Sequence, residues 1–210
     1  MTLPTSGLIT VNDRGARAAT TFGSVAAAGG NMVFIKKLTA SSSGTLSFVN
    51  GASNVVLDST YKEYLFTFNN IHPGTNNVIF SVNFRDGGSN YDAPKTTTWF
   101  NAYHNEDGGS AGVSYNNNGD LAQSTAGQYL GWSMYNDNDQ SASGYLHLFN
   151  PSSTTFVKHF IARVNNYYDN GSADAYVAGY CNTTTAIDGV QFAMSSGNID
   201  AGDICLYGIS

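Results

Sequence analysis

Apolar and polar residues alternate along most of the chain after residue 30. Residues 62–71 place Tyr64, Phe66 and Phe68 on one side and Leu65 and Thr67 on the other. A period of two is what a half-buried β-strand requires. Segments of this kind, bounded by Gly, Asn, Asp, Ser or Pro, are residues 31–40, 45–50, 62–71, 77–84, 97–104, 145–150, 156–164, 175–181, 189–195 and 203–209. The pattern predicts about ten short strands.

This pattern also predicts how the strands are arranged. No window shows a convincing apolar stripe of helical period, so strands must pack sheet on sheet or close into a barrel. Strict alternation favours antiparallel strands with one face towards water. Long polar connections, such as residues 105–128, suit a Greek-key or jelly-roll sandwich better than a meander. We therefore predict one all-β domain over residues 31–210, an antiparallel jelly-roll-like sandwich with its last strand inside a sheet.

Residues 1–30 have a different character. Small residues dominate them, aromatic residues are nearly absent, and the segment ends in AAAGG, which is typical of a hinge. Such a segment cannot bury enough apolar surface to order itself alone. We expect an extended arm that docks on another protein, and its candidate docking residues are Leu3, Pro4, Leu8, Ile9, Val11, Arg14 and Arg17.

Composition narrows the possible functions. Only 11% of the residues are charged, whereas 13% are aromatic, and the net charge is −6. An acidic chain with few cations is not expected to bind a nucleic-acid backbone. No apolar run reaches the ~18 to 20 residues that span a bilayer, so no membrane contact is expected. The first thirty residues lack the features of a signal peptide, which predicts synthesis and folding in the cytoplasm.

Catalytic and metal-binding motifs are not evident. His104, Glu106 and Asp107 adjoin one another, but neighbours on one loop rarely converge on one substrate, and a solvated loop is the simpler interpretation. Residues 136–141 (NDNDQS) alternate oxygen ligands without the spacing of a calcium loop, which leaves open only a site built from several loops. No Cys/His spacing supports a zinc site. We predict no enzyme activity, no metal and no cofactor.

Two cysteines lie on separate expected strands. Cys181 and Cys205 are interpreted as small buried apolar residues, and the sequence leaves a disulfide between them open.

Aromatic residues in or beside the polar loops are the clearest candidates for binding. Stacking platforms next to amide and carboxylate groups suit sugar rings, but tyrosine and tryptophan are also enriched in protein interfaces. Burial in the sandwich or in a subunit interface remains the simplest alternative. The candidates are Tyr91, Trp99, Tyr103, Tyr115, Tyr129, Trp132 and Tyr135.

Several stretches resemble known proteins. They are LTASSSGTLSFVNGASNVVLDSTYKEYLFTFNNIHP, AYHNE, GDLAQSTAGQ, NDNDQSASGYLHLFNPSSTTFVKHFIA and SGNIDAGDICLYGI. Together they resemble a group of small virion structural proteins of tailed phages, especially marine phages of cyanobacteria. The opening LPTSGLITVNDRGAR is similar to an N-terminal tag of phage tail and fibre proteins, although Arg14 and Gly15 replace its usual isoleucine and acidic helix start.

The resemblance implies a virion component without catalytic residues. Our first hypothesis is a tail-associated protein of fibre or adhesin type, a homotrimer that docks on other virion proteins by its arm and contacts a host surface polysaccharide. The second is a capsid decoration protein that stabilises the shell. A glycan-degrading enzyme is the third, and neither the β-helix nor the paired carboxylates usual in such enzymes is evident.

Overall fold

A computed structural model of the protein describes residues 31–210, which contain twelve β-strands and no helix, and hence no helix able to cross a membrane. The proposed arm and its docking residues lie outside the described residues. The strands are β1 (Met32–Thr39), β2 (Leu46–Val49), β3 (Glu63–Pro73), β4 (Val78–Arg85), β5 (Lys95–Asn105), β6 (Ala111–Tyr115), β7 (Gln128–Met134), β8 (Ala142–Phe149), β9 (Lys158–Tyr168), β10 (Gly171–Cys181), β11 (Gly189–Met194) and β12 (Ile199–Ile209).

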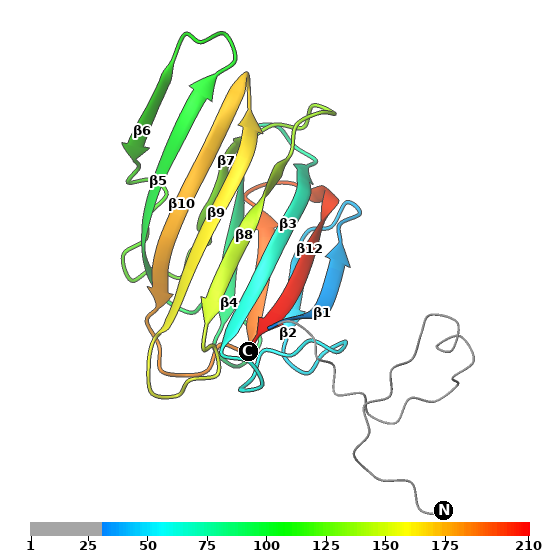
Figure 1. Ribbon diagram of the computed structural model, residues 1–210, viewed down its shortest axis with the longest axis vertical. Coiled ribbons are helices and arrows are strands. Elements are labelled where there is room, and N and C mark those ends of the chain that lie inside the picture. The colour runs from blue at the N-terminus through cyan, green and yellow to red at the C-terminus, as the bar shows by residue number, and fades with distance from the viewer. Residues whose placement is uncertain (1–30) are drawn as a thin grey trace, which may run out of the picture. The chain divides into compact units, whose positions relative to one another are not determined.

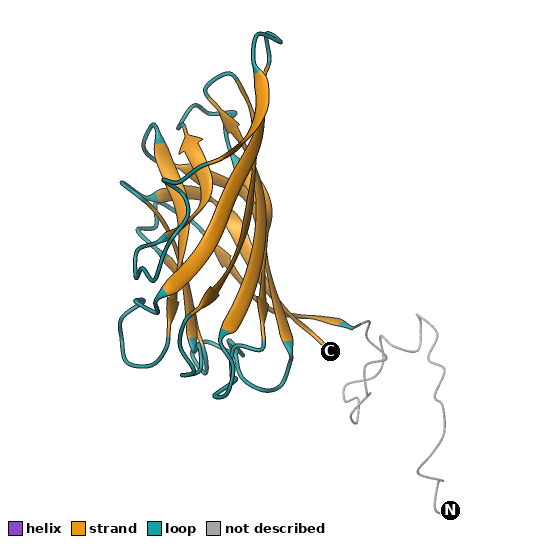
Figure 2. Cartoon of the chain, turned by 90° about the vertical axis from the view of Figure 1, so that its left-hand side faces the viewer, coloured by secondary structure: helices purple, strands orange, loops and turns teal. Residues whose placement is uncertain are grey.

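These strands form two sheets that pack face to face. The large sheet has the order β1-β12-β3-β8-β9-β10-β5-β6, and the small one has the order β2-β11-β4-β7. Figure 1 shows the large sheet in front of the small one, and Figure 2 shows the two layers from the side. Pairing is antiparallel throughout both sheets. The predicted antiparallel β-sandwich is confirmed.

Sheet connectivity follows the Greek-key expectation. Strand β3 pairs with β8 and β12, and β5 pairs with β10, so many neighbours in space are distant in sequence. Strand β12 lies between β1 and β3. The last strand is therefore inside the large sheet, in agreement with the Greek-key order expected from the sequence.

An aromatic cluster holds the two layers together. Phe192 of β11 lies with its ring centroid 5.5 Å from that of Phe66, 5.2 Å from that of Phe68 and 5.9 Å from that of Phe80. All four side chains are fully buried. Edge-to-face aromatic pairs add roughly 0.5–1.5 kcal/mol each to the free energy gained by burial. Phe192 thus joins the small sheet to β3 of the large sheet.

Two strands were not expected from the sequence. Strand β6 lies within the segment interpreted as a long polar loop, and its side chains are mostly exposed. Strand β7 (QYLGWSM) has an irregular burial pattern because the register shifts twice where it pairs with β4. Neither strand therefore carries the clean alternation on which the prediction depended.

Substitution of Phe192 by alanine is expected to destabilise the fold by about 3–5 kcal/mol, because it removes a buried ring and leaves a cavity between the sheets. Phe156→Ala is the matched control, since Phe156 is 70% exposed, and it should change stability by less than about 0.5 kcal/mol. Chemical denaturation measures both values. Equal stability of the two variants would contradict this role of Phe192.

Candidate functional site

Exposed apolar side chains gather on the outer face of the large sheet, the face directed away from the small sheet. Strand registers place on this face the exposed residues Phe34, Phe100, Val113, Tyr115, Tyr145 and Ile161. Phe34 lies apart on edge strand β1, whereas the other five residues lie on β6, β5, β9 and β8. Single exposed apolar residues are normal, but a group on nearby strands marks an interaction surface. The outer face is therefore the candidate site.

The centre of this face is a row of side chains across neighbouring strands. In order from β6 to β8, the aromatic row consists of Tyr115, Phe100, Tyr176, Arg163 and Tyr145. The rings of Phe100 and Tyr176 stack in parallel, with centroids 4.8 Å apart and an interplanar angle of 2°. The Arg163 guanidinium lies 4.8 Å from the centroid of the Tyr176 ring. Stacking of this kind restricts the rotation of side chains that would otherwise be mobile on an exposed surface.

Asp174 holds two side chains of the aromatic row, Arg163 and Tyr176, in place. Nε and Nη2 of Arg163 donate to Asp174, with the Nη2–Oδ2 distance at 2.6 Å. The Tyr176 hydroxyl also donates to Asp174, at 3.1 Å. The hydrogen bonds between Arg163 and Asp174 raise the pKa of Arg163 above its ordinary value, so the guanidinium stays charged. Asp174 thus orients a cation and an aromatic ring together.

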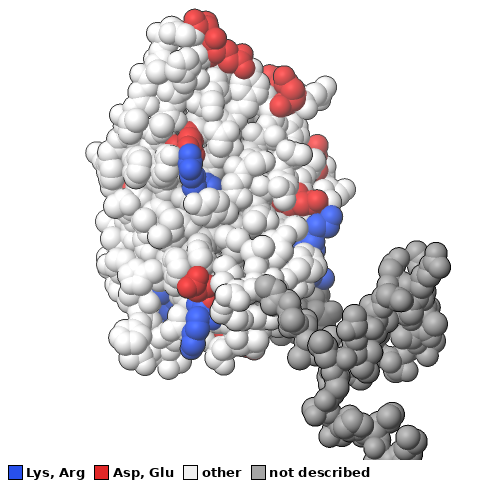
Figure 3. Space-filling model, in the orientation of Figure 1, with Lys and Arg blue, Asp and Glu red and all other residues white. Residues whose placement is uncertain are grey.

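Other formal charges are scarce in the central part of the face. The outward positions of β5, β10, β9 and β8 carry only Arg163 and Asp174 as fully charged residues, besides the histidines. Figure 3 shows this face as mostly uncharged, with one adjoining cationic and anionic group near its middle. The electrostatic field of the surface is therefore weak, and a highly charged partner would find little complement there.

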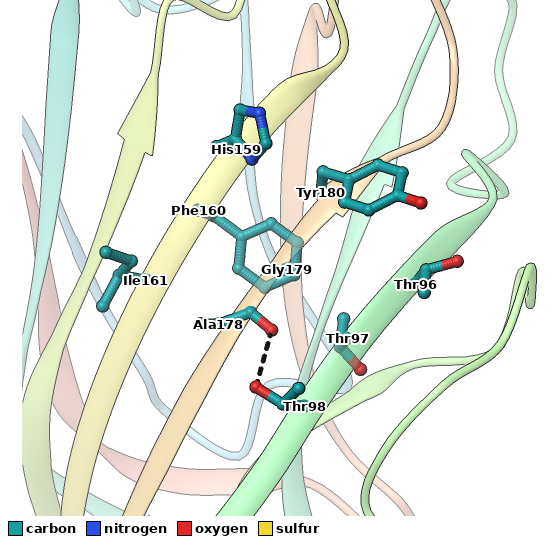
Figure 4. Close-up of a pocket in the computed structure, with 9 residues that line it drawn as sticks. All are labelled: Thr96, Thr97, Thr98, His159, Phe160, Ile161, Ala178, Gly179 and Tyr180. Carbon is teal, nitrogen blue, oxygen red and sulfur yellow. Dashed lines mark hydrogen bonds between the residues drawn. The ribbon is translucent and has the colours of Figure 1, made fainter.

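Shallow hollows lie along β9 and β10. The largest, of about 480 Å³, is shown in Figure 4. His159 and Ile161 of β9 line one side of it, Thr96 and Thr98 of β5 line the other, and Tyr180 closes one end. The hollow is deepest over Ala178 and Gly179 of β10, because these residues have small side chains or none. Beside them, the Thr98 hydroxyl donates to the Ala178 carbonyl at 3.3 Å.

Three further hollows continue the first one. A hollow of about 250 Å³ shares Thr98 and Ile161 with it. The next, of about 340 Å³, shares Tyr145 and Arg163 with the second, and a fourth, of about 290 Å³, shares Asn165 with the third. We call this chain of hollows the trough. It follows β9 from His159 to Tyr167.

Only part of the sequence-predicted aromatic set lies at this site. Tyr115 belongs to the aromatic row, and its hydroxyl donates to Asp120 at 2.6 Å. Trp132 is exposed on β7 of the small sheet and stacks on Tyr168, with centroids 6.5 Å apart. Tyr91, Tyr103, Tyr129 and Tyr135 are half-buried and lie apart from the trough.

Trp99 is a correction to the sequence analysis. It is only 1% exposed and lies inside the sandwich, where its ring packs edge to face against Trp132 with centroids 6.4 Å apart. Inward positions of β5 alternate with outward ones, so Phe100 takes the surface position beside it. Trp99 therefore cannot contact a ligand on the surface.

The acidic and polar loops lie at two separate hollows of the described residues. His104 and Glu106 line the end of the trough with Tyr167, and no second carboxylate lines that hollow. Residues 138–141 border a separate polar hollow of about 490 Å³ with His72 and Asp200. Within residues 31–210 no group of three or more His, Cys, Asp or Glu residues could hold a metal ion.

A buried row of ionisable groups lies on the opposite, inner face of the large sheet. Lys95, Cys181 and Lys158 occupy paired positions on β5, β10 and β9, and all three are fully buried. Lys95 Nζ donates to Asn83 Oδ1 at 2.8 Å and to the Ala93 carbonyl at 3.0 Å. Burial lowers the pKa of Lys95 to about 8.

The other two groups of this row are also held inside the protein. Lys158 Nζ donates to three backbone carbonyls, of which that of Thr183 is nearest at 2.8 Å. Burial raises the pKa of Cys181 to about 12, so its thiol is a poor nucleophile at neutral pH. Both cysteines are free and buried, so they form no disulfide. We interpret the row as structural.

Comparison with known proteins adds nothing to this geometry: no family model, curated protein or solved structure matches the chain.

The depressed pKa of Lys95 predicts a pH-dependent stability. Between its folded value of about 8 and its ordinary 10.5, the unfolded chain binds a proton that the folded chain does not, so the free energy of unfolding rises with pH. The Cys181 thiol opposes part of this rise from about pH 8 upward, because its ordinary pKa of 9.0 is raised by burial in the folded state. Burial also lowers the pKa of Lys158, which adds to the rise. We therefore expect a net gain of about 0.5–1 kcal/mol from about pH 8 to about pH 9.

Denaturation with urea at both pH values measures this gain. In Lys95→Met most of the increase in the free energy of unfolding between the two pH values should disappear. In Lys37→Met, which alters an exposed lysine, the increase should remain. A wild-type protein whose stability is constant or falls over this interval would contradict the assignment.

Proposed function

We propose that the protein is a non-enzymatic structural component of a tailed-phage particle, of the tail-associated fibre or adhesin type, which presents the outer face of its large sheet to a partner. One observation carries the binding role: five exposed aromatic and apolar side chains lie on β6, β5, β9 and β8 of the outer face. Arg163 and Asp174 are the only outward Lys, Arg, Asp or Glu side chains of β5, β10, β9 and β8. Such concentrations mark interaction surfaces. The virion setting is supported by the resemblance of residues 31–210 to small phage structural proteins.

Surface chemistry supports binding rather than catalysis. The trough is open and shallow, whereas enzymes usually enclose their substrates and exclude water. Two of its charged groups, Arg163 and Asp174, bind each other. The buried Lys95–Cys181–Lys158 row lies beneath the sheet, away from this face. No part of the proposal requires a metal or cofactor.

A capsid decoration protein is the second candidate, and the edge strand β1 favours it. Met32, Val33 and Phe34 are 55%, 41% and 57% exposed on this edge. An exposed apolar edge strand invites pairing with another chain, so natural proteins normally cover it. Neighbouring subunits of a shell or of a trimer would do so.

Immunogold labelling of purified particles tests the virion role and separates the two candidates. We expect a few to a few dozen copies at the tail, and hundreds of copies over the shell would instead establish decoration. Deletion of residues 1–30 should leave the melting temperature of the sandwich unchanged and abolish incorporation. Absence of the full-length protein from particles would contradict the proposal, and a deletion variant that unfolds would refute the arm as a separate unit.

Self-association is a separate prediction. Light scattering of the purified protein should give three times the chain mass of 22.3 kDa. Symmetric self-association is the rule for homo-oligomers, and exposed strand edges are normally covered. The number three follows from the resemblance to virion surface proteins, which often assemble as trimers. Phe34→Lys at the exposed β1 edge should shift the mass towards that of a single chain, and Phe156→Lys should not. A wild-type mass of a single chain across micromolar concentrations would contradict the trimer.

A further inference from the structure

The trough has the form of a site for an extended ligand. From His159 to Tyr167 the path along β9 covers eight residue steps, or roughly 27 Å at about 3.4 Å per residue. Neighbouring hollows along this path share lining residues, so they adjoin one another along β9. A ligand that fills it must be long and thin rather than compact.

Backbone pairing argues against a peptide strand in the trough. Strand β9 is hydrogen-bonded to β8 on one side and to β10 on the other along this length. Addition of a peptide as a further β-strand requires an unpaired sheet edge. Recognition in the trough must therefore come from side chains alone, with apolar contact and hydrogen bonds to scattered groups.

Charge on the lining argues for a neutral ligand. A polyanion such as a nucleic acid or a sulfated glycan needs several cations free to pair with it. Here Arg163 is the one Lys or Arg side chain that lines any of the four hollows, and Asp174 already binds its Nε and Nη2. Nη1 of Arg163 is therefore the guanidinium nitrogen that can donate a hydrogen bond to a neutral ligand.

The remaining lining groups match the two faces of a sugar ring. Tyr145 and Ile161 are 41% and 48% exposed, and each borders two adjoining hollows, where it offers an apolar surface for the C–H face of a ring. Asn165, Thr98 and the Tyr180 hydroxyl lie along the same path. Asn165 Nδ2 donates to Ser172 and Ala173, and the Thr98 hydroxyl donates to Ala178, so Asn165 Oδ1 and the Thr98 oxygen can accept from a sugar hydroxyl. The Tyr180 hydroxyl can donate or accept. Aromatic platforms beside a few polar groups are a general way to bind polar ligands with apolar faces.

We propose that the trough binds one chain of a neutral polysaccharide laid along β9, with sugar rings packed on Tyr145 and Ile161 and hydroxyl groups bonded to Asn165 and Arg163. This inference deepens the proposed attachment role and rests on it. It moves the expected glycan contact from the loop aromatics to Tyr145, Ile161, Arg163 and Asn165 of the large sheet, none of which was a candidate from the sequence.

Native gel electrophoresis of the full-length protein in gels that contain a polysaccharide tests the site. The neutral probes are dextran, yeast mannan, galactomannan, laminarin and hydroxyethyl cellulose, and the anionic probes are dextran sulfate and polygalacturonate. At least one neutral probe should retard the wild-type protein. Tyr145→Ala should weaken binding about tenfold or more, the loss expected for one stacking contact, and Ile161→Arg should block the trough.

Two controls make the result specific. Trp132→Ala removes an exposed aromatic residue of the small sheet and should leave the retardation unchanged, as should Phe156→Ala. All variants should melt within a few degrees of the wild type, because each altered side chain is at least one-third exposed. If a variant melts much earlier, Asn165→Ala, which alters another exposed position of β9, replaces it.

Three outcomes would overturn the inference. They are no retardation by any neutral probe, retardation by the anionic probes alone, and loss of binding in Trp132→Ala but not in Tyr145→Ala. Dissociation of the oligomer by Ile161→Arg would show that another copy of the chain covers the trough, which also overturns it. The proposed virion role is decided separately by immunogold labelling, so either proposal can fail without the other.

Discussion

Packing of the two sheets around Phe192 decides which side chains every strand of the large sheet presents to its surroundings. Side chains alternate along a β-strand, so burial of Phe66 and Phe68 against Phe192 turns Leu65 and Thr67 outward. Because paired residues of neighbouring strands point to the same side of a sheet, the strand registers fix which side chains of β8, β9 and β10 face outward as well. A slip of one residue would bury the aromatic row and expose the core.

The same packing therefore determines which side chains lie on the outer face. The types of side chain found there are not those that solubility alone would require. Polar residues suffice on a solvated face, yet this one carries stacked rings of Phe100 and Tyr176 beside an arginine. Asp174 neutralises that arginine and holds the row in place. Restrained apolar side chains on an open surface lose little conformational entropy when they contact a partner. We regard this preorganisation as the reason the face suits attachment.

Sequence patterns predicted the fold better than the site. Period-two alternation predicted most strands, and the expected Greek-key order placed β12 inside a sheet. Alternation missed β6 and β7, where exposure and register shifts remove it. Loops rich in polar residues directed attention to Trp99 and Trp132, because aromatic residues beside loops are often exposed. Tyr145, Arg163 and Tyr176 lie mid-strand, and only the pairing of distant strands brings them together. To identify them, one must know which alternate side chains of each strand face the second sheet. A single sequence does not contain that information.

Hydroxyl-radical footprinting of the isolated and partner-bound protein tests the central claim most directly, because it reports side-chain exposure residue by residue. In the isolated protein Tyr145 and Ile161 should be oxidised readily, whereas their strand neighbours Leu146 and Phe160 should be protected. On binding, oxidation of Tyr145 and Ile161 should fall severalfold while that of Trp132 stays constant. Equal labelling of Tyr145 and Leu146 in the isolated protein, or protection of Trp132 alone on binding, would contradict the account.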